Sequence, residues 1–245
     1  MTNHDVLAAA TLRITCGPSS GSGFFFLSTD TVVTNSHVVR GTGFAPADAV
    51  AITENGDSVT LDLLGESQPA DKDFAIFRVR GAAPTGTRAL VAKVLSPPER
   101  GTDLLFAGFP HGIPHLLVQR ALVSGLLAAD AFYLDGSVNG GNSGGPVVTA
   151  EDGRIVGIVT QRRFLGAQDL DALAADATQL AKHCRAMAGS GSVQIMGIDF
   201  GAFSGSMAQA MLLIQRAIMA NANAGIGIAF SIEHVLAKCR ALGIK

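Results

Sequence analysis

Short apolar runs separated by turn-forming residues recur along the first hundred residues of the chain. Glycine, proline, asparagine and aspartate punctuate the runs, which are residues 23–27, 31–34, 49–53, 59–64 and 74–79. This spacing predicts an antiparallel β-barrel. The 245 residues suffice for one large all-β domain or for two small barrels with a shared core.

A proline pair marks the best candidate for a domain boundary. Pro97 and Pro98 follow one another within residues 96–101, and consecutive prolines cannot continue a strand. Beyond them the pattern resumes in residues 103–107, 116–127, 132–134, 146–149 and 155–161. We therefore predict an all-β fold with an N-terminal barrel over residues 1–100 and a C-terminal barrel over residues 101–245.

The strand pattern stops between residues 166 and 223. Apolar residues recur there at helical spacing in two stripes, and Gly189 is a candidate C-cap of the first helix. The stripes are Leu170, Leu173, Ala177, Leu180, Cys184 and Met187, then Met207, Met211, Ile214 and Ile218. The second barrel is therefore expected to carry a mainly helical insertion. Its two helices are expected to be joined by a glycine-rich connection over residues 190–206, which contains an apolar run at residues 193–198 and a candidate hinge at Gly201 to Gly205.

Small residues surround one serine in the run Gly140-Gly141-Asn142-Ser143-Gly144-Gly145-Pro146. A hydrolase that attacks acyl carbons needs an exposed nucleophile, and N–H donors where negative charge develops on the carbonyl oxygen. Glycines let a substrate backbone approach closely. An ordinary turn between strands is the alternative interpretation. The rest of the chain favours the nucleophile.

A nucleophilic serine needs a base and a group that orients the base. His37 follows the strand-like run Thr31–Thr34, so its imidazole is expected at a strand end, where a rigid scaffold carries catalytic groups. Asp73 leads the apolar run 74–79, and a partly buried carboxylate there needs a partner such as an N–H of His37. The alternatives are a solvated turn histidine and a strand-capping charge. Asp71 is the rival carboxylate, further into the polar loop.

Taken together, these segments resemble the trypsin-like serine proteases, and among them the bacterial HtrA/DegP-type branch. The order His37, Asp73, Ser143 is the chymotrypsin-like order. The resemblance covers residues from about 11 to 166 and again from about 225 to the C-terminus, and no PDZ domain is expected after it. Five ordered motifs carry it: Gly21-Ser22-Gly23-Phe24, Thr34-Asn35-Ser36-His37-Val38-Val39, Asp73-Phe74-Ala75-Ile76, Gly108-Phe109-Pro110-His111-Gly112 and Gly141-Asn142-Ser143-Gly144-Gly145-Pro146.

The resemblance implies two six-stranded antiparallel barrels of the chymotrypsin-like fold and a catalytic triad. Ser143 is the implied nucleophile, His37 the general base and then acid, and Asp73 the orienting carboxylate. The oxyanion hole is implied at Gly141, Asn142 and Ser143, through the backbone N–H groups of Gly141 and Ser143.

The resemblance also implies where a substrate binds. The edge of the strand near Thr160 pairs with the peptide backbone. Ser137 lies near the base of the primary pocket and Val138 beside its wall. Neither residue offers a buried negative charge, so we expect cleavage after small or medium apolar residues, unless Asp135 reaches the pocket.

The leading functional prediction is a serine endopeptidase that acts on proteins or peptides through an acyl-enzyme. The alternative is a latent or self-inhibited protease fold that acts mainly through partner binding by residues 166–223. That insertion is interpreted as a lid or docking surface for a regulatory protein, or as helices that merely pack on the second barrel.

Charge and composition exclude other classes. A formal net charge of −2 gives no electrostatic case for nucleic acid, and the longest apolar stretch is interrupted by Gln215 and Arg216, so no membrane span is expected. We expect no cofactor and no metal, because Gly112 and Pro114 forbid the helix that would align His111 with His115. An odd set of three cysteines and no secretory signal favour a reducing cytoplasm, and the resemblance implies a bacterial source.

Overall fold

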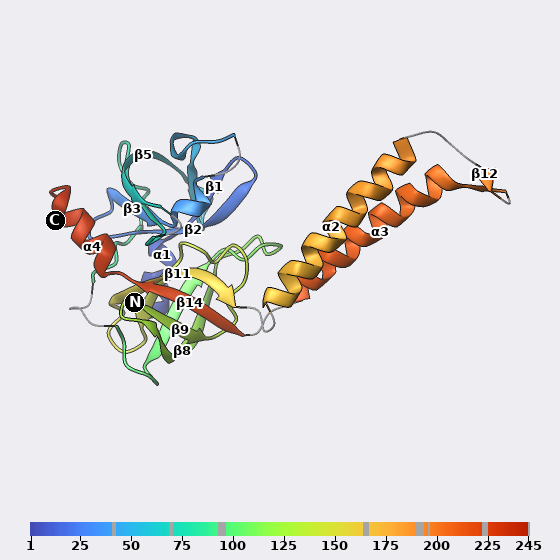
Figure 1. Ribbon diagram of the computed structural model, residues 1–245. Coiled ribbons are helices and arrows are strands. Elements are labelled where there is room, and N and C mark those ends of the chain that lie inside the picture. The colour runs from blue at the N-terminus through green and yellow to red at the C-terminus, as the bar shows by residue number, and fades with distance from the viewer. Residues whose placement is uncertain are drawn as a thin grey trace. The chain divides into compact units, whose positions relative to one another are not determined.

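The computed structural model describes residues 1–40, 43–68, 71–92, 97–163, 167–189, 194–195, 197–221 and 225–244. The chain divides into two compact units. The barrel unit comprises Met1–Arg162 and Gly225–Lys245, and the hairpin unit comprises Arg163–Ala224. The barrel unit contains two closed six-stranded antiparallel barrels (Figure 1), so the predicted chymotrypsin-like all-β fold is confirmed.

The first barrel closes in the strand order β1-β2-β3-β6-β5-β4. Its strands are β1 (Thr11–Cys16), β2 (Ser19–Phe25), β3 (Thr31–Thr34), β4 (Val50–Thr53), β5 (Ser58–Ser67) and β6 (Phe74–Val79). Strand β1 is absent from the predicted runs, although Leu12, Ile14 and Cys16 alternate along it and are buried. Two 3₁₀ turns, η1 (Ser36–Val38) and η2 (Pro46–Asp48), follow β3.

The second barrel closes in the order β10-β11-β14-β9-β8-β7. Its strands are β7 (Asp103–Gly108), β8 (Leu117–Ala128), β9 (Ala131–Asp135), β10 (Pro146–Thr149), β11 (Ile155–Arg163) and β14 (Ile226–Ser231). The insertion therefore leaves the barrel at the end of β11 and returns at the start of its neighbour β14.

Each barrel has its own apolar core, and a third cluster joins residues of both. Phe24 and Ile76 of the first barrel share this cluster with Leu105 and Val148 of the second. The rings of Phe24 and Phe26 meet edge to face, with centroids 6.1 Å apart. Burial of these side chains fixes how the two barrels meet, and the candidate site lies along their junction.

Two terminal helices pack across that junction. Helix α1 (Asn3–Ala10) contacts β7 and β8, whereas α4 (Glu233–Ala241) contacts β6. A capping box between Thr2 and Asp5 begins α1. Each helix therefore contacts the barrel at the other end of the chain. The predicted domain limits at residue 100 remain a prediction.

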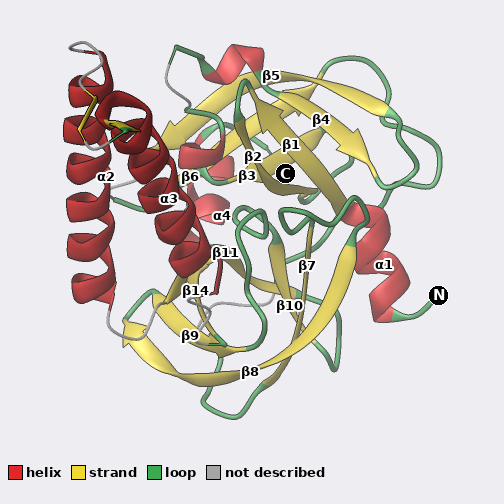
Figure 2. Ribbon diagram, turned by 90° about the vertical axis from the view of Figure 1, so that its right-hand side faces the viewer, coloured by secondary structure: helices red, strands yellow, loops and turns green. Residues whose placement is uncertain are grey.

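The hairpin unit consists of two helices joined by a short ribbon. Helices α2 (Ala167–Gly189) and α3 (Phe200–Asn221) lie side by side in both views (Figures 1 and 2), and β12 (Gln194–Ile195) pairs with β13 (Ile198–Asp199) between them. The insertion is therefore mainly helical, as predicted. Val193 and Met196 of the apolar run lie outside the described residues.

Small residues line the contact between α2 and α3. Ala181, Ser204 and Ala208 are buried, and a Cβ added at Gly205 would lie 3.9 Å from the Cβ of Ala188. The sequence placed Gly201 to Gly205 in a connecting loop, as a hinge. That prediction is wrong, because these residues lie inside α3, where a glycine costs only about 1 kcal/mol and permits close helix packing.

Candidate active site

Ser143 lies in a turn between the two barrels, just before β10. The N–H of Gly144 donates to the carbonyl of Val159 on β11 at 2.8 Å, which anchors the turn. Gly144 has a φ of +85°, and a Cβ there would lie 2.1 Å from the carbonyl oxygen of Ser22. Only glycine fits this position. The tight turn leaves the Ser143 side chain half-buried and its hydroxyl available for chemistry.

His37 and Asp73 lie together as the sequence predicts. The backbone N–H of His37 donates to Oδ1 of Asp73 at 3.0 Å, and its Nδ1 lies 2.7 Å from Oδ2. Thr160 adds a third donor, because its Oγ1 donates to Oδ2 at 2.8 Å. A carboxylate only accepts, so Nδ1 carries the proton and Nε2 keeps a free lone pair. This is the tautomer that a general base needs.

The backbone of Asp73 is held in an unusual conformation. Its φ is +49°, in the left-handed region that few residues other than glycine adopt, although aspartate tolerates it. The buried amide of Asn35 donates to the Asp73 carbonyl at 2.7 Å and holds this turn. The rival carboxylate, Asp71, is exposed and accepts from the Ser67 hydroxyl at 2.9 Å. Asp73 is therefore the carboxylate that faces the imidazole.

The Ser143 hydroxyl points at Thr160 rather than at His37. Its Oγ donates to the carbonyl of Thr160 at 3.2 Å, and Nε2 of His37 has no hydrogen-bond partner among the described residues. The His37 side chain is 40% exposed, whereas that of Asp73 is 4% exposed. Rotation about the Ser143 Cα–Cβ bond redirects the hydroxyl, and such contacts commonly tighten only when substrate binds.

Two backbone N–H groups beside Ser143 are unpaired within the described part of the chain, those of Gly141 and of Ser143 itself. The carbonyl before each one is fixed. The Gly140 carbonyl accepts from the N–H of His111 at 2.7 Å, and the Asn142 carbonyl accepts from the N–H of Gly145 at 2.9 Å. A trans peptide points its N–H away from its carbonyl, so both donors face away from these partners. Both N–H groups are therefore unpaired donors, which is what an oxyanion hole requires.

The predicted specificity residues occupy different environments. Ser137 is exposed, and its carbonyl accepts from the side chain of Asn139 at 3.1 Å. Val138 is buried in the apolar core of the second barrel. A Cβ added at Gly227 would lie 2.4 Å from the Cγ2 atom of Val138. Thr160 is buried beside Asp73 and Ser143. The sequence suggested only that the backbone near Thr160 pairs with substrate. It gave no sign that the Thr160 hydroxyl donates to Asp73.

Two ion pairs brace the residues that precede His37 and Asp73, and sequence reasoning missed both. Glu66 pairs with Arg40 and accepts from the hydroxyl of Ser36 at 3.2 Å; the Arg40 guanidinium lowers the pKa of Glu66. Asp130 pairs with Lys72 and lies 2.8 Å from Nε2 of His234. Lys72, then His234, lower the pKa of Asp130. The loop before Asp73 is thereby tied to the second barrel.

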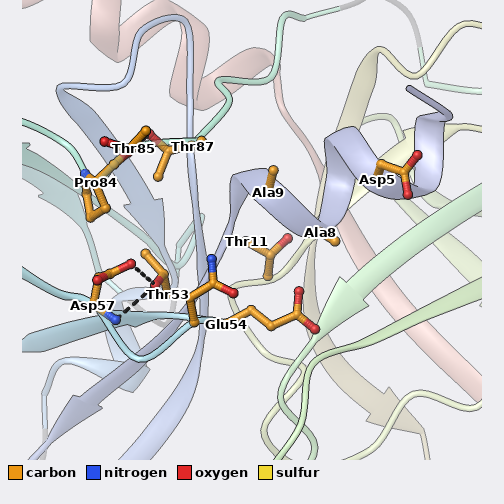
Figure 3. A pocket seen from close by; sticks show the side chains of 12 residues that line it. Asp5, Ala8, Ala9, Thr11, Thr53, Glu54, Asp57, Pro84, Thr85 and Thr87 are labelled. Carbon is orange, nitrogen blue, oxygen red and sulfur yellow. Dashed lines mark hydrogen bonds between the residues drawn. The ribbon is translucent and has the colours of Figure 1, made fainter.

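One cavity of the barrel unit lies away from the triad residues. A pocket of about 260 Å³ is lined by α1, by the turn at residues 53–57 and by the loop at residues 84–87 (Figure 3). Thr53 and Asp57 hydrogen-bond to each other within it, and none of the triad residues lines it. Within the described residues, no group of three His, Cys, Asp or Glu could hold a metal ion, and no helix could span a membrane.

Comparisons with known proteins find similarity to peptidases. The family profile described as "Trypsin-like peptidase domain" matches residues 21–158. The chain is similar to Protease Do-like 1, chloroplastic, from Arabidopsis thaliana, with 31% identity over 152 residues. The match covers 58% of this chain and 33% of that protein, so the chain spans a third of that relative's length.

Solved structures share the fold. The serine endoprotease from Yersinia pestis superimposes with a TM-score of 0.55 and 23% identity, over 66% of this chain and 57% of that one. An inactive form of Rv3671c from M. tuberculosis H37Rv superimposes with a TM-score of 0.59 and 16% identity, over 98% and 90% of the two chains.

Proposed function

This chain belongs to the trypsin-like peptidase family, and we propose that it is a serine endopeptidase that uses Ser143, His37 and Asp73. One observation carries the proposal: three donors, two from His37 and one from Thr160, converge on the buried carboxylate of Asp73. That arrangement stabilises the imidazolium that forms when His37 takes a proton. The similarity to proteases of the Do-like (HtrA) group supports the same reaction class.

In the proposed reaction, Nε2 of His37 removes the proton of the Ser143 hydroxyl as Oγ attacks the scissile carbonyl. The N–H groups of Gly141 and Ser143, in the turn that contains Asn142, bind the developing oxyanion. His37 then protonates the leaving amine, and an acyl-enzyme remains on Ser143. Water activated by the same imidazole hydrolyses it.

The substrate is proposed to complete the site. Without substrate, the Ser143 hydroxyl donates a hydrogen bond to the carbonyl of Thr160 at 3.2 Å. A peptide that pairs with the edge of β11 offers a backbone N–H to that carbonyl, as strand addition requires. The substrate N–H then competes with the hydroxyl for this carbonyl, and the hydroxyl turns toward Nε2. Substrate binding therefore favours the reactive rotamer of Ser143.

The proposed cleavage preference is for small or medium apolar side chains. Val138 fills space beside Gly227, and Ser137 supplies no charge, so a lysine or arginine side chain has no partner at these residues. Asp135 is exposed at the end of β9. A profile of cleaved peptides dominated by Lys or Arg would overturn this preference and favour Asp135 as the pocket charge.

A latent protease that acts through partner binding is the second candidate. The exposed apolar side chains of the hairpin unit favour it, since Ile198, Phe203 and Leu213 are each at least half exposed. In this version the insertion at residues 166–223 regulates the site or docks a regulatory protein. Without such a partner, the triad stays unreactive.

A fluorophosphonate probe separates the two candidates. We expect the full chain to be labelled, with no labelling of Ser143→Ala, and peptide hydrolysis to track the labelling. If only a chain with residues 166–223 replaced by a short turn is labelled, the latent version is supported. Absence of labelling in both would contradict an assembled triad.

A further inference from the structure

A buried hydroxyl of the first barrel holds the turn that carries the nucleophile. Ser22 lies on β2 and is completely buried. Its Oγ donates to the carbonyl of Gly141 at 2.7 Å and accepts from the N–H of Phe109 at 2.9 Å. Its backbone N–H donates to the carbonyl of Ser143 at 2.8 Å. One residue of the first barrel therefore fixes two carbonyls of the nucleophile turn.

The peptide between Gly141 and Asn142 lies between the two unpaired N–H groups of the site. Ser22 holds its carbonyl end, and the Asn142 N–H at its other end donates to the Asn139 carbonyl at 3.1 Å. The peptides on either side are held through the carbonyls of Gly140 and Asn142. Three consecutive planar peptides are thus oriented by fixed partners. The Ser22 hydroxyl is the one side chain among these partners.

We propose that Ser22 is a positioning residue for the oxyanion hole: its hydroxyl sets the orientation of the Gly141–Asn142 peptide and so the spacing of the Gly141 and Ser143 N–H groups. The inference rests on the proposed function, because an oxyanion hole has a use only if Ser143 attacks carbonyls. Oxyanion donors act in the transition state and contribute little to binding the ground state.

The groups around the turn would not hold a freed Gly141 carbonyl in one orientation, because an unpartnered side-chain amide lies nearby. Both side-chain amide atoms of Asn142 are buried without a hydrogen-bond partner among the described residues. A Cβ on Gly108 would lie 2.7 Å from the Ser22 Oγ and 3.0 Å from the Asn142 Oδ1. Without the Ser22 hydroxyl, the Phe109 N–H and the Gly141 carbonyl are left unpaired, and the Asn142 amide can compete for them. The turn then has more than one arrangement.

Kinetics of Ser22→Ala test the proposal. We expect kcat to fall roughly 10- to 100-fold while KM changes less than about twofold, because a misplaced donor weakens only the transition state. A peptide aldehyde, whose adduct with Ser143 places an oxygen at the oxyanion site, should lose affinity in the same proportion. Ser22→Cys keeps a weaker hydrogen-bond donor, so its kcat should lie between those of the native chain and Ser22→Ala. If Ser22→Ala fails to fold, the kinetics of Ser22→Cys test the proposal instead.

Thr11→Val is the matched control. The Thr11 hydroxyl is also buried and donates to the Leu7 carbonyl at 2.7 Å, away from the nucleophile turn. The Thr11→Val substitution should lower thermal stability without lowering kcat. If Thr11→Val and Ser22→Ala lose equal activity at equal stability, or if only KM rises in Ser22→Ala, the positioning role is wrong.

Hydrogen exchange distinguishes this proposal from the proposed function. The hydrogen-bonded amides of the turn, those of Asn142, Gly144 and Gly145, should exchange at least about tenfold faster in Ser22→Ala than in the native chain, while those of β7 and β10 stay protected. This result is expected even if the native chain neither hydrolyses peptides nor binds the fluorophosphonate, in which case only the proposed function fails. Unchanged exchange in this turn would overturn the role of Ser22.

Discussion

The barrel unit and the hairpin unit bury different kinds of side chain. In the barrel unit, aromatic and branched side chains such as Phe24, Phe77 and Phe106 are completely buried, and buried polar groups form the network around Asp73. In the hairpin unit, the described buried residues are Ala181, Ser204 and Ala208, while Phe203 and Leu213 are exposed. The barrel unit is built to hold side chains in one geometry, and the hairpin unit to bring two helices close.

This difference assigns the chemistry to one unit. Catalysis needs groups held within fractions of an ångström, which a densely packed scaffold provides. Every hydrogen bond described around His37, Asp73 and Ser143 has both partners in the barrel unit. Substitutions of the same kind in the two units should therefore have very different consequences.

The largest difference is expected for serine-to-alanine substitutions. Ser143→Ala should lower kcat by on the order of 10⁴–10⁶, because only the oxyanion donors and substrate binding remain. His37→Ala should be similarly severe. Ser206→Ala on α3, which removes an exposed hydroxyl that donates to Ala202 at 3.1 Å, should leave peptide hydrolysis unchanged. Comparable losses in both serine variants would show that catalysis does not belong to the barrel unit alone.

The second prediction separates orientation from folding. Asp73→Asn should lower kcat by on the order of 10⁴, because an amide nitrogen cannot accept from His37 or Thr160 and favours the wrong tautomer. Asparagine tolerates the φ of +49°, so the fold should persist. Circular dichroism and thermal melting check the fold, and peptide hydrolysis checks the activity. Retained turnover would rule out Asp73 as the orienting group.

The sequence predicts local patterns of this molecule better than its long-range contacts. Strands 31–34, 74–79 and 146–149 have the bounds that their apolar runs indicate. Strand β1 was missed, although its residues alternate, and so was α1, although Thr2 and Asp5 form a capping box at its start. Both are short, and their burial depends on distant partners.

Pairs far apart in sequence explain what could not be predicted about the site. Thr160 meets Asp73 across 87 positions, and Ser22 meets Gly141 across 119. A threonine in an apolar strand and a serine between glycines carry no local sign of such contacts. His37, Asp73 and Ser143 were found because their flanking motifs resemble a family. The contacts of Thr160 and Ser22 become apparent only in the folded structure.

Phenylalanine substitutions extend the comparison to stability. Phe24→Ala should destabilise the barrel unit by about 3–5 kcal/mol, since it deletes a fully buried ring from the cluster shared by the two barrels. Phe203→Ala should cost less than about 1 kcal/mol, because that residue is 50% exposed and its one ring contact within the described residues is with Phe200. Thermal melting of both variants measures the contrast. Equal shifts of the melting temperature in the two variants would mean that Phe203 is buried in solution, against another part of the chain or another molecule.

The smallest expected effect is a difference in the rates at which the cysteines of the two units are chemically modified. It concerns neither activity nor stability, only how readily each unit exposes a thiol. Cys239 on α4 is completely buried, and burial raises the pKa of its thiol to about 11, so at pH 8 only about 0.1% of it is thiolate. Cys16 is buried as well, whereas Cys184 on α2 is half-buried. Iodoacetamide should therefore modify Cys184 first, and Cys16 and Cys239 only when the barrel unit opens. Peptide mapping over time gives the three rates. If Cys239 reacts as fast as Cys184, α4 leaves the first barrel far more often than its burial predicts.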